Sequence, residues 1–257
     1  MVLNKSVFAG VVRYVKNGAL TITGIQTILD AFATLRPYMT GCDESIVFAT
    51  ASLRGLVNAK EVLQIIQEQT GVSVRLLSEE EEAWYDYLGL CSAKSLSAGI
   101  GGDLGGGSMQ LYTFAAGGVT AQTSLPLGSM RLKCDFIHGA LPTKKEAAAL
   151  SAYVTERLSA WPAFRNVGHS TLYLTGGSIR AITMLWGKAG QISAEEIQKA
   201  TETLSFDVLE AAFQNRAETI PAALLTIAAV LQYTSCTEVE AVMCGVREGI
   251  LAEITGR

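Results

Sequence analysis

The distribution of glycine is the feature that most limits how this chain can fold. Nine of its 25 glycines lie between Gly89 and Gly118. Within that stretch, short apolar runs at residues 97–104 and 109–114 flank four small residues, and a third run follows at residues 119–126. Apolar runs of this length favour strands, and the glycines between them allow tight turns. The sequence therefore predicts a three-stranded antiparallel meander.

Helical and extended patterns alternate on both sides of the meander. Apolar spacing typical of helices occurs at residues 23–38, 58–70, 78–90, 144–159, 179–186, 194–214 and 222–233. Short β-branched runs occur at residues 45–50, 72–77, 171–174 and 239–243. This alternation predicts an α/β protein whose parallel strands are covered by helices. A length of 257 residues fits one large domain or two small ones.

Composition excludes several classes of protein. A net charge of −4 and a pI near 5.3 give no general attraction to nucleic acid. We expect no membrane span, because no run reaches the roughly 18–20 apolar residues that one requires. The five cysteines are far apart and form no C-x-x-C pair, which favours a cytoplasmic location. With two histidines, a site built from many histidines is excluded.

The segment after the first meander strand has the residues of a phosphate and metal site. It consists of Asp103 and then, after Leu104, of Gly105, Gly106, Gly107 and Ser108. Glycines allow backbone N–H groups to converge on an anion, and a carboxylate suits a hard divalent cation. A plain hairpin turn explains this segment about equally well.

A second glycine turn, formed by Gly176, Gly177 and Ser178, stands between a predicted strand and a predicted helix. The amino end of a helix favours an anion, so this turn tilts the interpretation of both turns toward phosphate.

Two further groups of side chains are ambiguous. Ser78 and Glu81 fit a capping box at a helix start, but the four adjacent carboxylates at residues 79–82 exceed what capping needs. One of them can serve as a general base toward water. Arg54, just after a predicted strand, suits either a phosphate clamp or an ordinary surface position.

Together these segments resemble the exopolyphosphatase and guanosine pentaphosphate phosphohydrolase family. The first lies at residues 49–58 and resembles AT-x-x-x-R-x-x-x-N, and residues 78–83 resemble S-G-x-E-E-A. Residues 103–108 resemble D-[IL]-G-G-G-S, and residues 124–132 resemble S-L-x-x-G-x-x-R-L. Two later glycine motifs match at residues 176–181 and 245–249. Each motif is weak alone, but six in the right order are a strong signal.

The resemblance implies an actin-like ATPase-type fold with two RNase-H-like lobes around a cleft, at residues 1–95 and 96–257. It implies hydrolysis of the terminal phosphoanhydride of polyphosphate or guanosine pentaphosphate with Mg²⁺. By position, Glu82 would be the base that activates water and Asp103 would bind magnesium. The two glycine turns would cradle phosphate and Arg54 would contact it.

The sequence also departs from the family pattern. The family begins with a D-x-G-S-N-[ST] strand and loop that these 257 residues lack, so we expect an incomplete first lobe and weak or no activity of the chain as given. Glu79, Trp84 and Gln110 stand where the family usually has Gly, Arg and Glu. A non-catalytic relative that binds polyphosphate or nucleotide is thus an alternative. A sugar or acetate kinase of the same superfold is less favoured, because a kinase does not need Glu82. An open sheet edge in the short lobe would favour a homodimer.

Overall fold

The computed structural model describes residues 5–186 and 190–256. Contacts within the chain divide it into two compact units, Met1–Ser78 and Glu79–Arg257. Helix α4 (Glu79–Ala93) packs on the second unit's strands and on its last helix. The sequence predicts a boundary near residue 95 between two RNase-H-like lobes. The division into contact units does not test where one lobe ends and the next begins, so this boundary stays a prediction.

The first unit is mainly helical. Its helices are α1 (Ile22–Leu35), α2 (Ala51–Arg54) and α3 (Ala59–Thr70). Two short parallel strands, β3 (Phe48–Ala49) and β4 (Arg75–Leu76), and a two-stranded hairpin, β1 (Val15–Lys16) with β2 (Ala19–Leu20), complete it. Helix α3 ends at Gly71, whose φ of 73° is the left-handed conformation that glycine adopts readily.

The second unit is built on a six-stranded sheet of order β7-β6-β5-β8-β10-β9. Its strands are β5 (Gly99–Leu104), β6 (Met109–Ala115), β7 (Gly118–Leu125), β8 (Thr171–Thr175), β9 (Gln191–Ser193) and β10 (Glu238–Ala241). The first three form the predicted antiparallel meander, and β8 and β10 extend the sheet in parallel with β5. Three meander strands followed by two parallel ones is the RNase-H-like order.

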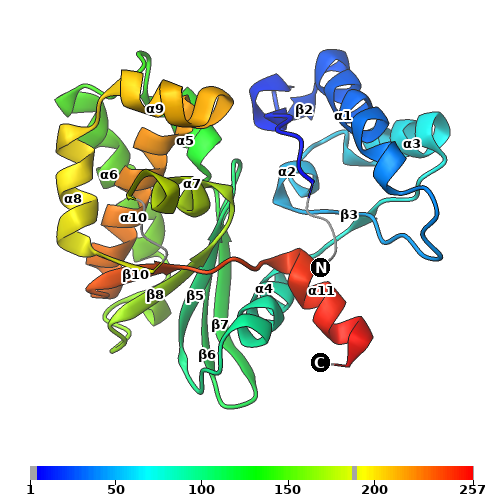
Figure 1. Ribbon diagram of the computed structural model, residues 1–257. Coiled ribbons are helices and arrows are strands. Elements are labelled where there is room, and N and C mark those ends of the chain that lie inside the picture. Colours follow the sequence, from blue (N-terminus) through cyan, green and yellow to red (C-terminus); the bar gives the residue numbers. More distant parts are fainter. Residues whose placement is uncertain (1–4, 187–189, 257) are drawn as a thin grey trace. The chain divides into compact units, whose positions relative to one another are not determined.

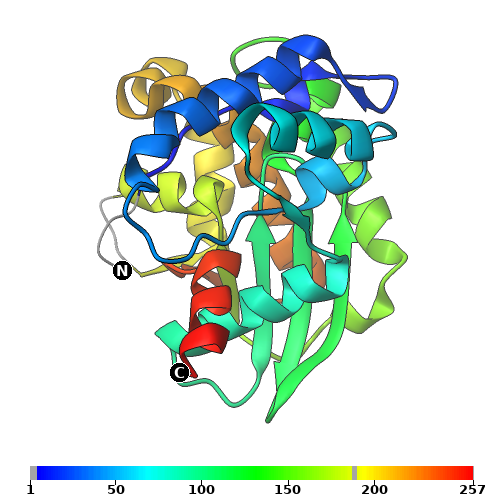
Figure 2. The same ribbon diagram turned by 90° about the vertical axis from the view of Figure 1, so that its right-hand side faces the viewer.

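Helices cover both faces of this sheet. One face carries α5 (Ser129–Phe136), α6 (Lys144–Ser159), α7 (Gly177–Trp186), α8 (Ala194–Thr203), α9 (Phe206–Phe213) and α10 (Ile220–Thr234) (Figure 1). The other face carries α4, which lies across the meander strands, and α11 (Val246–Thr255) beside it (Figure 2). The main hydrophobic core lies between the sheet and the first group of helices. The fold class predicted from the sequence, a mixed α/β protein, is confirmed.

Helix α10 is the core helix of the second unit. Residues Arg216–Thr234 are long and apolar enough to cross a membrane by length and composition, which the sequence patterns did not indicate. However, 78% of the relevant window is buried inside the protein. Helices α5, α6, α7 and α8 all pack against α10, so its apolar surface is used within the fold.

The start of α6 supports a prediction about acid. Glu146 accepts hydrogen bonds from the backbone N–H and hydroxyl of Thr143 and from the backbone N–H of His138, with its Oε1 also 2.8 Å from His138 Nδ1. The Thr143 amide is the largest of the contacts that lower the pKa of Glu146 from 4.5 to about 2. A carboxyl whose pKa is depressed by folding stabilises the native state above its unfolded pKa, and that stability disappears as pH falls toward the folded pKa.

We therefore expect Glu146→Gln to lower the free energy of unfolding at pH 7 and to converge with the wild type between about pH 5 and pH 2. Urea unfolding of both proteins at several pH values measures this. Equal differences at pH 7 and pH 3 would show that the charge is not responsible.

Candidate active site

The first glycine turn joins β5 to β6 and is held by the start of α5. The backbone N–H of Gly105 donates to the carbonyl of Ser108 at 3.0 Å, which closes the turn. The Gly105 carbonyl accepts from the Ser129 N–H, and the Gly106 carbonyl accepts from the next two amides of α5, all at 3.0 Å. Arg131 Nε donates to the Gly107 carbonyl at 3.0 Å. These bonds point the carbonyl groups of the turn toward α5. The opposite side of the turn is therefore free to present its N–H groups to an anion.

Gly128 allows this close approach between α5 and the turn. A Cβ at position 128 would lie 2.3 Å from Gly107 C and Ser108 N and 2.4 Å from Gly106 C. All three are backbone atoms, which have little freedom to move aside. A glycine is required here because of this contact, since the backbone of Gly128 itself is in an ordinary extended conformation.

Gln110 orients the hydroxyl at the end of the turn. Its side chain is 1% exposed, and its Nε2 donates to Ser108 Oγ at 3.0 Å and to Ser124 Oγ at 3.3 Å. The neutral amide therefore organises two hydroxyl groups at a position where the sequence pattern suggested a carboxylate.

Replacing Gln110 with Met should cost about 1–2 kcal/mol of unfolding free energy, because a similar volume is kept while two hydrogen bonds are lost. Urea denaturation measures the difference. Ser124→Ala removes only the longer of the two bonds and should cost less. If Ser124→Ala costs as much as Gln110→Met, the bond to Ser108 carries no stability.

Asp103 lies at the end of β5, beside the second glycine turn. Its Oδ1 is sealed from solvent and has no hydrogen-bond partner among the described residues. Burial first, and then the charge of Glu82, raise the pKa of Asp103 to about 6, while Arg180 and the Thr175 hydroxyl oppose the rise. Gly176 of the second glycine turn contacts this carboxyl. Its φ of +105° favours glycine, and an added Cβ would overlap Asp103 Oδ1.

The two glycine turns are linked through a buried hydroxyl pair. Ser178 Oγ, in the first turn of α7, lies 3.0 Å from Ser129 Oγ, and the Ser129 hydroxyl also donates to the Gly105 carbonyl at 3.4 Å. The structure thus brings together the predicted residues of both turns and Asp103 at one end of the sheet.

Two arginines lie by the second turn. Arg216 packs so closely on Gly177 that a Cβ at position 177 would overlap its guanidinium. Partial burial and the neighbouring charge of Arg180 lower the pKa of Arg216. Paired guanidinium groups at the amino end of a helix are suited to an anion. The sequence patterns gave no role to either arginine.

Glu82 lies in the first turn of α4 and is 2% exposed. It is close enough to Asp103 and to Asp86 to raise the pKa of each carboxyl. Among the four carboxylates at residues 79–82, Glu79 and Glu80 are exposed and Glu82 is buried. Its burial distinguishes Glu82 from them as a candidate general base.

Arg54 lies in the first unit, at the end of α2. Its Nη1 donates to the Leu77 carbonyl at 2.9 Å, so part of the guanidinium holds the exit of β4. Asn58 has a structural contact of the same kind, because its amide bonds both the N–H and the carbonyl of Leu20. Whether Arg54 also contacts phosphate stays a prediction.

Comparison with known proteins decides the family. The profile of the Ppx/GppA phosphatase family matches residues 14–257, which is most of the chain. The chain belongs to the Ppx/GppA phosphatase family. This confirms the resemblance drawn from the six motifs and the enzyme class, a hydrolase of the exopolyphosphatase type.

Curated relatives of this Ppx/GppA family member are similar over most of their length. It is 26% identical to "Exopolyphosphatase 1" of Mycobacterium bovis over 258 aligned residues, which cover 91% of this chain and 74% of the relative. The same figures hold for "Exopolyphosphatase 1" of Mycobacterium tuberculosis strain H37Rv.

Solved structures confirm the fold of this Ppx/GppA protein. An exopolyphosphatase from Cytophaga hutchinsonii has a TM-score of 0.81 at 17% identity, covering 93% of this chain and 85% of that one. A Ppx/GppA family member from Aquifex aeolicus has a TM-score of 0.71 at 20% identity, covering 93% and 84%. The fold is thus the actin-like ATPase type that the motifs implied.

Sequence reasoning missed one acidic member of the site. Asp86 is fully buried on α4, one helical turn after Glu82. A carboxylate four residues after another on one helix shares its face, and that spacing was the available signal.

Proposed function

We propose that this chain hydrolyses the terminal phosphoanhydride bond of inorganic polyphosphate or of guanosine pentaphosphate. The observation that carries the proposal is the pair formed by buried Glu82 and half-buried Asp103, whose Oδ1 is sealed from solvent, beside the turn formed by Gly105, Gly106, Gly107 and Ser108. Phosphoryl transfer needs positioning, charge neutralisation and an oriented water more than covalent help. The turn can position the phosphates, Glu82 can orient a water, and a cation at Asp103 would neutralise phosphate charge.

In the proposed reaction, the amides of the two glycine turns hold the terminal phosphates. Glu82 accepts a proton from a water molecule, whose oxygen attacks the terminal phosphorus. The bond from that phosphorus to the bridging oxygen breaks. The products are orthophosphate and a substrate one phosphate shorter. Arg54 is proposed to contact phosphate.

The residues at Asp103 fit a magnesium ion. Asp103 Oδ1 is an orphaned buried acceptor, and Mg²⁺ is usually held by one or two carboxylates, with water and substrate phosphates completing its shell. The described residues form no group of three or more acidic, histidine or cysteine side chains able to hold a metal, so water and substrate phosphate would supply the remaining ligands. When bound, Mg²⁺ would neutralise phosphate charge.

Release of orthophosphate from polyphosphate of defined length, with Mg²⁺ and again with EDTA, tests this function. Guanosine pentaphosphate is the second substrate to assay, since both present the same terminal phosphates. We expect release that depends on Mg²⁺. Absence of phosphate release from both substrates would overturn the proposal.

A second function, binding without turnover, is favoured by one observation. Gln110 is a neutral side chain whose amide is already bonded to Ser108 and Ser124, so it adds no charge for a metal. Binding of polyphosphate with no phosphate release would support this function. In either case we propose a cytoplasmic location, because all five cysteines are free thiols.

A further inference from the structure

Asp86 lies in the same acidic cluster as the two carboxylates assigned above. It is one helical turn after Glu82 on α4, and the two side chains are 0% and 2% exposed. Helix α4 lies across β5, β6 and β7 (Figure 2), and the side chains of Glu82 and Asp86 are both buried where it packs against the sheet and α11. Asp103, at the end of β5, is the neighbouring charge that acts most strongly on Asp86.

Three carboxylate oxygens of this cluster, on Asp86 and Asp103, lack protein hydrogen-bond partners. Both carboxylate oxygens of Asp86 and Oδ1 of Asp103 are sealed from solvent and meet no hydrogen-bond donor at proper geometry in the described part of the chain. The Tyr112 hydroxyl, close to Asp86, is also buried without a partner there. Buried carboxylate oxygens without hydrogen-bond partners are costly, and the Val246 amide, Thr175 and Arg180 offset this cost only in part.

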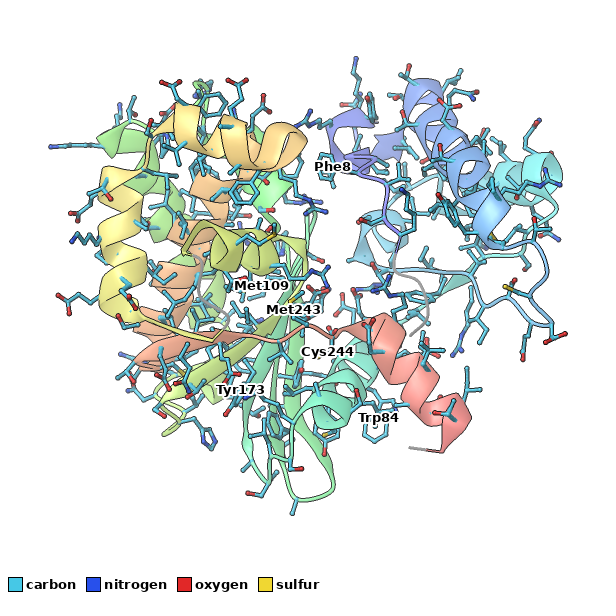
Figure 3. The ribbon with its side chains drawn as sticks, in the orientation of Figure 1. Phe8, Trp84, Met109, Tyr173, Met243 and Cys244 are labelled. Carbon is cyan, nitrogen blue, oxygen red and sulfur yellow. The ribbon has the colours of Figure 1, made fainter. Side chains whose placement is uncertain are left out.

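The surroundings of Asp86 supply little compensating positive charge. On the sheet, its neighbours are Asp103 and Tyr112, and on α11 its charged neighbour is Glu248. The Val246 amide favours the ionised form of Asp86, but it does not outweigh burial and the neighbouring negative charges. Its Oδ1 lies near Gly245, at the amino end of α11, and Cys244 precedes that glycine (Figure 3). Arg180 acts on Asp103 and on Cys244. The cluster is therefore more negative than the described neighbours neutralise.

A hard divalent cation is the ligand that completes such a cluster. Carboxylate and hydroxyl oxygens are its preferred ligands, and Mg²⁺ keeps several waters and needs few protein groups. We propose that Asp86 is a further ligand, directly or through a bound water, of the divalent cation held by Asp103. This inference rests on the proposed function, because it concerns the same cation.

Cation binding without substrate tests the role of Asp86. Asp86→Asn and Asp103→Asn are compared with wild type and with Asp135→Asn, the same change at an exposed residue of α5. Free Mn²⁺ is titrated by electron paramagnetic resonance, and the thermal midpoint is measured in EDTA and in Mg²⁺. We expect Asp86→Asn to weaken Mn²⁺ binding by about 10–100-fold. In EDTA it should melt no lower than wild type, since an unpaired buried charge is removed.

Each other outcome has a defined meaning. Unchanged Mn²⁺ affinity in Asp86→Asn, with binding lost in Asp103→Asn, would overturn the role of Asp86 and leave the proposed function standing. Failure of the wild type to bind Mn²⁺ would also overturn this inference, while phosphate release with Mg²⁺ decides the function separately. Asp86→Ser, smaller and neutral, repeats the test if Asp86→Asn does not fold.

Discussion

Replacing Glu82 with Gln is expected to lower the rate of phosphate release by about 10²–10⁴-fold, the usual contribution of a general base. Gln keeps the shape of the side chain but cannot accept the proton of the attacking water. Substrate binding should be retained, because binding is assigned to the glycine turns and the cation. Stopped-time assays of orthophosphate, together with a separate measurement of polyphosphate binding, separate the two effects.

Glu80→Gln is the matched control for this variant. Glu80 lies in the same helical turn but is exposed, so the same chemical change should leave the rate unaltered. Retained turnover in Glu82→Gln would refute its role as the base.

The second large effect is expected at Gly128. An alanine Cβ would overlap backbone atoms of Gly106, Gly107 and Ser108, so the first glycine turn or α5 must shift. Overpacking of this kind typically costs 1–3 kcal/mol, and we expect a value near the top of that range, about 3 kcal/mol. Phosphate release should fall as well, because the turn proposed to hold phosphate is displaced.

Urea denaturation and the phosphate assay measure the two consequences of Gly128→Ala. Gly139→Ala is the control, because a Cβ there would meet only the Leu141 carbonyl, at 3.4 Å. A Gly128→Ala protein as stable and active as the control would show that the turn can move aside without penalty.

Much of the fold could be predicted from local patterns. The predicted helix at residues 144–159 has the bounds of α6, and the meander strands agree within two residues at either end. The helix predicted over residues 194–214 was wrong as a single element, because α8 ends at Thr203 and α9 begins at Phe206. Leu204 is extended at that break, with ψ of 131°. Apolar spacing continues across the break, so periodicity could not detect it.

The helix α11 was missed for a different reason. Gly249 lies inside it, and glycine normally weakens a helix by roughly 1 kcal/mol. Here the glycine is required by packing, since a Cβ at position 249 would overlap the Tyr85 carbonyl of α4. A contact between residues so far apart in the chain cannot be predicted from the local sequence around Gly249.

The sequence predicted candidate site residues that are neighbours in one short motif. It missed candidate residues that come together only when the chain folds. Asp103 and the glycine turn are adjacent in sequence, so one short motif indicates both. Asp86 becomes part of the cluster only when α4 lies against the sheet, and Arg216 only when it packs on Gly177.

The backbone contact between α4 and α11 has a consequence for how the protein is made. A Cβ at Gly89 would overlap the Gly245 carbonyl, just as a Cβ at Gly249 would overlap the Tyr85 carbonyl. Helix α4 therefore packs against a helix that lies about 150 residues later in the chain. On the ribosome, the helix that carries Glu82 and Asp86 is translated long before α11. The contacts of Tyr85 and Gly89 with Gly249 and Gly245 can therefore form only late in synthesis, after this last part of the chain has emerged.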